Sequence, residues 1–179
     1  AIHALYSGQG VQQSEANAFL MRFSESDEAW QTAIQLISRA QGGDNLEDQT
    51  AYIASSVLHS KVCKNWKQLA LEQRAELGSS VMQMLTAVAQ GQLRVGRVVV
   101  SRLSLVLAAV SMRSDEGMTV LVTHALGISS LQTPVAVSVA LDMLKDVPDE
   151  IENGDLSRQR KMELKDELTR HLENVLQLC

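Results

Sequence analysis

The side chains that could take part in chemistry do not form a complete metal-binding set. His59 and Cys63 are four residues apart, so on a helix both would lie on one face and supply half of a zinc site. A closed zinc site needs four ligands, and neither His124 nor His171 has a second ligand at a suitable spacing. We therefore expect no metal site and no cofactor.

A second pattern resembles a phosphate-binding loop. Gly91 and Gly96 have the glycine spacing of such a loop, but Arg97 and Val98 stand where its lysine and its serine or threonine belong. The glycines also follow a predicted helix, whereas a phosphate-binding loop follows a strand. The sequence therefore predicts a helix end here, with Gly91 just beyond the last helical residue.

Three serines of the following segment are candidates for a nucleophile, and they are also weak ones. Ser101, Ser104 and Ser111 have no histidine and acid partners at a readable spacing. Small residues repeated in this way are typical of a close approach between two helices. We expect no catalytic residues, and we expect that the protein is not an enzyme.

Narrow polar strips on otherwise apolar helices are the sites that this sequence supports. Each strip is either a solvated face of a structural helix or, in an array of helices, part of a binding surface. We predict that these residues contact a partner, with Asp142 as a weaker member. They are Asp48, Gln49, Tyr52, Ser55, His59, Arg97, Ser101, Ser104 and Asp142.

The first strip belongs to residues 48–66, the stretch around which the rest of the chain is organised. Ile53, Ala54 and Val57 lie on one side of the predicted helix, and Leu58 and Val62 widen the apolar face beyond a half-turn. A helix that is apolar over so much of its circumference needs neighbours on both sides. It is therefore predicted to be an inner helix, flanked front and back.

The same arrangement recurs along the chain. Apolar helices begin near Ser14, Asp48, Arg94 and Thr133, with more amphipathic helices between them. These intervals, roughly 35 to 45 residues, match two-helix HEAT or armadillo units. We predict an all-α fold: one right-handed, curved α-solenoid over residues 1–179, made of about four HEAT-like repeats and a terminal helix without its partner.

Glycine and proline mark the predicted helix ends in the second half of the chain. The helix near residue 116 is predicted to end at Gly127, and the helix that starts at Thr133 and Pro134 is predicted to stop before Pro148. Residues 149–157 are then predicted to be an acidic loop. A long amphipathic helix is predicted from Arg158 onward.

Composition narrows the class of protein. Aromatic residues are only 3% of the 179, and prolines number 2, which favours long helices packed through aliphatic side chains. The net charge of −5 and the lack of a long apolar run lead us to expect neither direct nucleic-acid binding nor membrane insertion. Cys63 and Cys179 form no disulfide framework, so we expect a soluble intracellular protein. We also expect a fragment of a longer chain, because it does not start with methionine.

Four segments are similar, in order and in spacing, to segments of importin-β-family receptors. Residues 26–37 resemble their S-x-x-A-W … L-L opening, residues 49–66 their second-repeat helix, and residues 103–110 their third-repeat helix. Residues 141–150, Leu-Asp-Met-Leu-Lys-Asp-Val-Pro-Asp-Glu, are similar to the L-E-I-L-x-x-L-P-E-E signature of the transportin-SR and importin-thirteen branch.

This resemblance implies a function. It implies the N-terminal part of a nucleocytoplasmic transport receptor, a karyopherin that shuttles between nucleus and cytoplasm. Such a receptor binds Ran-GTP on its concave inner helices, carries protein cargo, and contacts the FG-repeat proteins of nuclear pores. The alternative is a helical-repeat scaffold or adaptor with no dependence on Ran. Cargo and transport direction stay open.

Overall fold

The computed structural model describes residues 8–26, 28–40 and 45–171, and within these ranges every regular element is a helix. The prediction of an all-α fold is confirmed. The helices are α2 (Val11–Glu25), α3 (Ala29–Ser38), α4 (Asn45–Asn65), the short η1 (Trp66–Gln68), α5 (Leu71–Ala89), α6 (Arg97–Met112), α7 (Gly117–Ser129), α8 (Pro134–Lys145), α9 (Val147–Asn153) and α10 (Arg158–Arg170).

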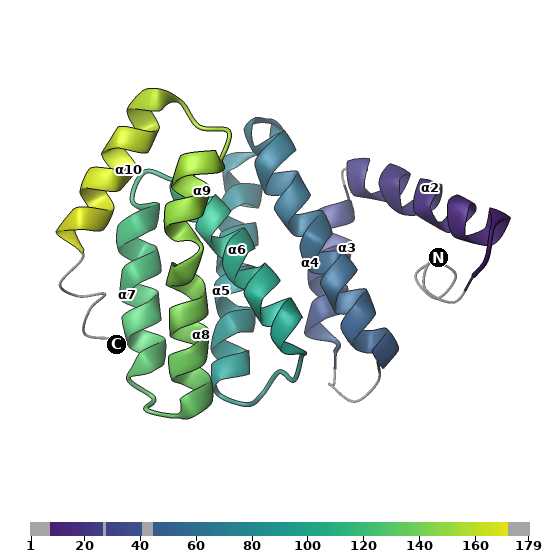
Figure 1. Cartoon of the computed structure of the whole chain (residues 1–179), viewed down its shortest axis with the longest axis horizontal. Coiled ribbons are helices and arrows are strands. Elements are labelled where there is room, and N and C mark those ends of the chain that lie inside the picture. The colour runs from purple at the N-terminus through teal and green to yellow at the C-terminus, as the bar shows by residue number, and fades with distance from the viewer. Residues whose placement is uncertain (1–7, 27, 41–44, 172–179) are drawn as a thin grey trace.

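The central helices form two rows. In the first row α4 packs against α6, and α6 packs against α8; in the second row α3, α5 and α7 follow one another. Each helix of the second row also packs against its successor in the sequence, α3 on α4, α5 on α6 and α7 on α8. Figure 1 shows α3 and α5 behind α4 and α6. This alternation is the helical-pair arrangement expected of an α-solenoid.

The core lies between the two rows. Leu58, Leu85, Leu103, Leu121 and Met143 are fully buried, and each comes from a different helix, from α4 through α8. Burying one such side chain contributes roughly 1.5 to 3 kcal/mol. The apolar residues that gave the predicted helices their broad faces therefore fill one continuous core, which fixes the positions of the polar residues beside it.

Helix α2 extends away from the two rows (Figure 1), and Ala16 is its one buried residue. Its C-terminal end is held by the buried Lys61 of α4, whose Nζ donates a hydrogen bond of 3.2 Å to the backbone oxygen of Glu25. A cation at a helix C-terminus is favourable because the carbonyl groups there carry partial negative charge. The helix begins at Val11, so the predicted start at Ser14 was wrong; the Ser14 N–H already bonds to Gly10 inside the first turn.

Residues 149–153 of the segment predicted to be an acidic loop belong to helix α9, so the prediction was wrong there; residues 154–157 are non-helical, as predicted. Pro148 lies in the first turn of α9, where no backbone N–H is required, and Asp149 and Glu150 stand at the positive end of the helix. Val147 and Ile151 are buried against the core. The proline thus starts a helix, whereas it was interpreted as a stop signal.

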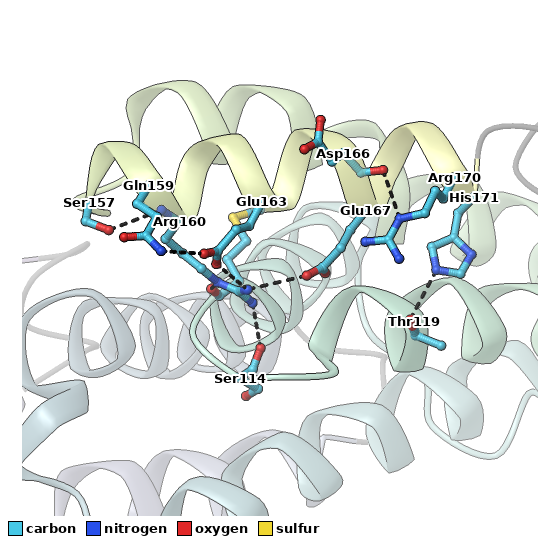
Figure 2. A network of polar contacts seen from close by, with 11 residues as sticks. Ser114, Thr119, Ser157, Gln159, Arg160, Glu163, Asp166, Glu167, Arg170 and His171 are labelled. Carbon is cyan, nitrogen blue, oxygen red and sulfur yellow. Dashed lines mark hydrogen bonds and ion pairs between the residues drawn. The ribbon is translucent and has the colours of Figure 1, made fainter.

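Helix α10 closes the described part of the chain, and Arg160 attaches it to α6. Its guanidinium donates 2.8 and 3.1 Å hydrogen bonds to the backbone oxygens of Ser114 and Met112, at the C-terminal end of α6. Figure 2 shows Arg160 between Ser114 and the carboxylates of Glu163 and Glu167, both 3.4 Å away. The arginine neutralises the negative end of one helix and pairs with acids of its own helix.

Candidate functional site

Several of the polar residues predicted to face a partner instead connect one helix to another. The first example is Asp48, in the first turn of α4. Its Oδ1 accepts a 2.9 Å hydrogen bond from the backbone N–H of Gly96, the residue that precedes α6. A Cβ on Gly96 would lie 2.8 Å from Asp48 Oδ2, so the absence of a side chain permits this approach. Asp48 therefore fixes the start of α6.

Tyr52 makes the second connection. The guanidinium of Arg102 in α6 lies over the Tyr52 ring, 5.5 Å from its centre, and donates a 3.1 Å hydrogen bond to the phenolic oxygen. These contacts with Arg102 lower the pKa of Tyr52. The pair is a cation–π contact combined with a hydrogen bond, and it lies at the accessible edge between α4 and α6.

His59 makes the third connection, to α9. Its Nε2 lies 3.6 Å from Cys63 Sγ on the same helix and 3.5 Å from Glu150 Oε1. The hydrogen bond with Cys63, followed by that with Glu150, raises the pKa of His59 to about 9 despite partial burial. The same contact lowers the pKa of Glu150. His59 is therefore an imidazolium at neutral pH, and it forms an ion pair that holds α9 against α4.

This cluster does not have the geometry of a cysteine nucleophile with its base. In such a site one imidazole nitrogen faces the thiol and the other faces the acid, whereas Cys63 and Glu150 both face Nε2 of His59. Among residues 8–26, 28–40 and 45–171, no three His, Cys, Asp or Glu side chains are grouped so that they could hold a metal ion. The contacts explain a structural role for His59.

The fourth connection joins α6 to α8. Lys145 Nζ donates a 3.0 Å hydrogen bond to Ser101 Oγ and forms a 2.8 Å ion pair with Asp142 Oδ1. Asp142 is only 4% exposed, and its Oδ2 has no hydrogen-bond partner among the described residues. The same holds for the buried hydroxyl of Ser104. The charge on Asp142 is therefore compensated by Lys145.

Three of the nine predicted contact residues are inaccessible to a partner in this structure, namely Ser55, Ser104 and Asp142. Their predicted exposure was wrong. Ser55 is fully buried and donates to the backbone oxygen of Tyr52, and Ser104 is packed among its neighbours at 1% exposure. Small polar residues suit the seam between two packed helices, because they let the backbones approach and can bond to nearby carbonyls.

The accessible surface of the inner helices α4 and α6 only partly coincides with the predicted polar strips. Gln49 on α4 and Arg97 and Ser101 on α6 remain accessible, as predicted. The exposed ridge of α6, however, also carries Val98 and Arg102, which the predicted strips did not include. Val98 and Arg102 are four residues apart and directly follow Arg97 and Ser101, so a helical wheel places them beside the predicted strip.

The outer row carries a groove between α5 and α7. One section has a volume of about 520 Å³ and is lined by Thr86 and Leu131 among others. A neighbouring section of about 460 Å³ extends toward Trp66. Both sections share Met82 and Val120, so they form one continuous groove with an apolar floor.

Within the described ranges, the helices are too short or too polar to cross a bilayer.

Comparison with known proteins gives consistent matches. Residues 16–87, from α2 into α5, match the family model described as the importin-beta N-terminal domain. Importin-13 of Bos taurus and importin-13 of Homo sapiens are each 24% identical to this chain over 168 residues, which is 90% of it. Exportin-1 of Schizosaccharomyces pombe is 29% identical over 84 residues, or 47% of the chain. The resemblance drawn from the sequence motifs is confirmed.

The matched region is a small part of each relative. The chain covers 16% of importin-13 and 7% of exportin-1. The similarity to importin-13 runs along nearly all of this chain, while the similarity to exportin-1 is confined to about half of it.

Proposed function

We propose that this chain, whose importin-β-family resemblance these matches confirm, is part of a nucleocytoplasmic transport receptor that binds Ran-GTP and carries protein cargo. The observation that carries the proposal is the importin-beta N-terminal domain match over residues 16–87, combined with an uninterrupted row of inner helices, α4, α6 and α8. An array of this kind offers an extended surface for protein partners.

The accessible residues of that row are the proposed contacts with Ran-GTP. Gln49 and Tyr52 of α4, with Arg97 and Ser101 of α6, have side chains that a partner can reach. Tyr52 is a rigid amphipathic anchor, of the kind enriched at protein interfaces. A second group, Asp48, His59, Ser55, Ser104 and Asp142, is proposed to act by holding the helices that present the first group.

Such a receptor works by coupling two binding events. Ran-GTP changes the affinity for cargo only if the two ligands favour different arrangements of the helices, and the coupling is reciprocal. The polar connections between α4, α6 and α8 are suitable sites for such a change. Each joins two neighbouring helices through one residue pair, namely Asp48 with Gly96, Tyr52 with Arg102, and Ser101 with Lys145, so a small rotation of one helix would break it. No catalytic step is required of the receptor itself.

The groove between α5 and α7 is the proposed site for FG-repeat proteins of the nuclear pore. Met82, Val120 and Leu131 offer apolar surface there, and Thr86 and Gln90 offer hydrogen-bonding groups at its side. A groove of this composition suits a short extended segment with isolated apolar side chains. Contact with the pore would allow the protein to shuttle between nucleus and cytoplasm.

The test is a titration of the intact protein against Ran loaded with GTP and with GDP. The contact variant is Gln49→Arg, because Gln49 is accessible and no hydrogen bond or ion pair of its side chain with another described residue is seen. Asp48 and Tyr52 are unsuitable for this test, because both residues hold α6 through Gly96 and Arg102. We expect Gln49→Arg to weaken Ran-GTP binding about tenfold, with an unchanged circular dichroism spectrum.

The second candidate is a helical-repeat scaffold without dependence on Ran. It is favoured by one observation: Asp48, Tyr52 and His59, three of the residues that the sequence predicted to contact a partner, are already engaged inside the molecule. If the intact protein binds both nucleotide forms of Ran equally, or neither form, the scaffold is the better account. A wild type selective for GTP with an unaffected Gln49→Arg variant would reject only the choice of Gln49.

A further inference from the structure

We propose that the exposed ridge of α6, together with Lys145 of α8, binds an acidic amphipathic polypeptide segment of a partner protein. The ridge consists of Arg97, Val98, Ser101, Arg102 and Leu105. This inference deepens the proposed receptor function, on which it rests, by naming the chemistry of a segment that the inner row would recognise.

The ridge has an apolar centre and basic sides. Val98 and Leu105 are seven residues apart and therefore lie in line, about 10.5 Å apart along the helix axis. Val98 is 64% exposed. Arg102 lies on the side toward α4, where it bonds to Tyr52, and Ser101 lies on the side toward α8, where it bonds to Lys145.

Two positive charges of this ridge, those of Arg97 and Arg102, have no carboxylate partner among the described residues. Arg97 is exposed and makes no ion pair with another described residue. Arg102 interacts with the phenol of Tyr52, whereas Lys145 is already paired with the buried Asp142 at 2.8 Å. Because the whole chain carries a net charge of −5, two arginines on one ridge without a described carboxylate partner are not simply its average composition. Carboxylates from a partner would complete them.

Nearby acids define the limits of the surface. At the start of α6, Asp48 directs one oxygen to the Gly96 N–H, so it offsets part of the charge of Arg97. At the other end, α9 packs against α6 and brings Asp149 and Glu150. The basic region is therefore restricted to the first half of α6. A segment of two to three helical turns, with acids on both sides of an apolar line, has a matching shape.

The composition favours a polypeptide over a single-stranded nucleic acid. Single strands are held by bases stacked on exposed aromatic rings, and the aromatic ring of Tyr52 beside this ridge already has the Arg102 guanidinium over one face. Val98 and Leu141, which is 38% exposed on α8, offer aliphatic contact instead. Aliphatic anchors flanked by cations match a helix with leucines on one face and glutamates beside them.

The experiment uses the intact protein and a fluorescein-labelled peptide of about 15 residues. The peptide contains glutamate and alanine, with two leucines seven residues apart; a second peptide has lysine in place of glutamate. Fluorescence anisotropy measures binding of both. We expect the acidic peptide to bind and the lysine peptide not to bind. The Arg97→Glu variant should bind the acidic peptide about tenfold more weakly than the wild type, and binding should be weaker at about 0.3 M salt than at low salt.

Arg158→Glu is the matched control. Arg158 is exposed and is the first residue of α10, as Arg97 is the first residue of α6, so both changes have the same effect on the helix dipole. We expect Arg158→Glu to change the affinity less than about twofold. Equal losses in both variants, equal binding of the two peptides, or displacement of the acidic peptide by a single-stranded RNA of similar length at equal concentration would overturn the proposal.

The Ran titration separates this inference from the function on which it rests. A protein that is selective for Ran-GTP but does not bind the acidic peptide overturns the inference and supports the receptor. A protein that binds the peptide through Arg97 but ignores the nucleotide on Ran supports the surface and rejects the receptor.

Discussion

Asp48 and Gly96 are joined by a 2.9 Å hydrogen bond, from the backbone N–H of Gly96 to the Asp48 carboxylate, across 48 positions of the sequence. The bond connects the first turn of α4 to the residue that precedes α6. Two successive inner helices are thereby fixed at their starts. The exposed side chains along both helices depend on this connection for their relative positions.

We expect Asp48→Ala to lower the free energy of unfolding by about 1 to 3 kcal/mol, because the Gly96 N–H would lose its hydrogen-bond acceptor. Gly96→Ala should also destabilise the wild type, since the new Cβ would lie 2.8 Å from Asp48 Oδ2. In an Asp48→Ala background that collision is absent, so Gly96→Ala should cost less. Urea denaturation of the four proteins measures this coupling, and strictly additive effects would contradict it.

Three alanine substitutions on α6 should change the free energy of unfolding by different amounts. Leu103→Ala removes a fully buried core side chain and should cost about 2 to 5 kcal/mol. Ser101→Ala removes only a half-exposed acceptor and should be nearly silent. Ser104→Ala should leave stability unchanged or raise it, because its buried hydroxyl bonds to none of the residues that the structure describes. Chemical denaturation compares the three, and a loss at Ser104 similar to that at Leu103 would show that its hydroxyl is bonded.

Two glycines of α7 should respond in opposite ways to alanine. A Cβ at Gly117 would overlap the backbone oxygen of Ser111, which cannot move without shifting the end of α6, so Gly117→Ala should cost at least about 2 kcal/mol. A Cβ at Gly127 meets no atom within 4 Å, and alanine is a better helix former, so Gly127→Ala should stabilise by about 0.5 to 1 kcal/mol. Thermal unfolding of both variants is the measurement. A stabilised Gly117→Ala variant would contradict the tight turn between α6 and α7.

His59 should make stability depend on pH in the alkaline range. Its pKa rises from 6.5 to about 9 on folding, so the folded state binds the proton more tightly. The associated stability is fully present below about pH 6.5 and is lost as the pH rises through about 9. Glu150, whose pKa is lowered from 4.5, contributes above pH 4.5 and loses its contribution in acid.

The corresponding experiment compares wild type with His59→Gln between about pH 6 and pH 10. We expect the difference in free energy of unfolding to shrink as the pH rises, and Cys63→Ala to lower the pKa of His59 in an NMR titration. A difference that stays constant across this range, or a pKa unaffected by the loss of Cys63, would show that the imidazole is not held by these two groups.

The arrangement of helices could be predicted from the sequence because the apolar faces determine it. The broad apolar face of residues 48–66 correctly indicated a helix with neighbours on both sides, and Thr133 does begin α8, its hydroxyl accepting a bond from Ala136. Pro148 was misread because a proline is compatible with either the end of one helix or the first turn of the next. Only the burial of Val147 and Ile151 distinguishes these cases.

The candidate site could be predicted less well. A polar strip at helical spacing is produced equally by residues that face solvent and by residues that bond across a helical seam. Asp48 and Tyr52 bond to Gly96 and Arg102, which lie about 50 positions away in the sequence, and nothing in the local pattern reveals such partners. The ridge around Val98 was missed because an exposed valine looks like a core residue until its neighbours are known.

The most direct test of the proposed receptor function is the affinity of the intact protein for Ran in its two nucleotide states. That function requires tighter binding of Ran-GTP than of Ran-GDP, by at least about tenfold, or 1.4 kcal/mol. Isothermal titration with Ran loaded with a non-hydrolysable GTP analogue and with GDP gives both affinities under one set of conditions. Equal affinities, or binding to neither form, would contradict the receptor and leave a helical scaffold as the function of this chain.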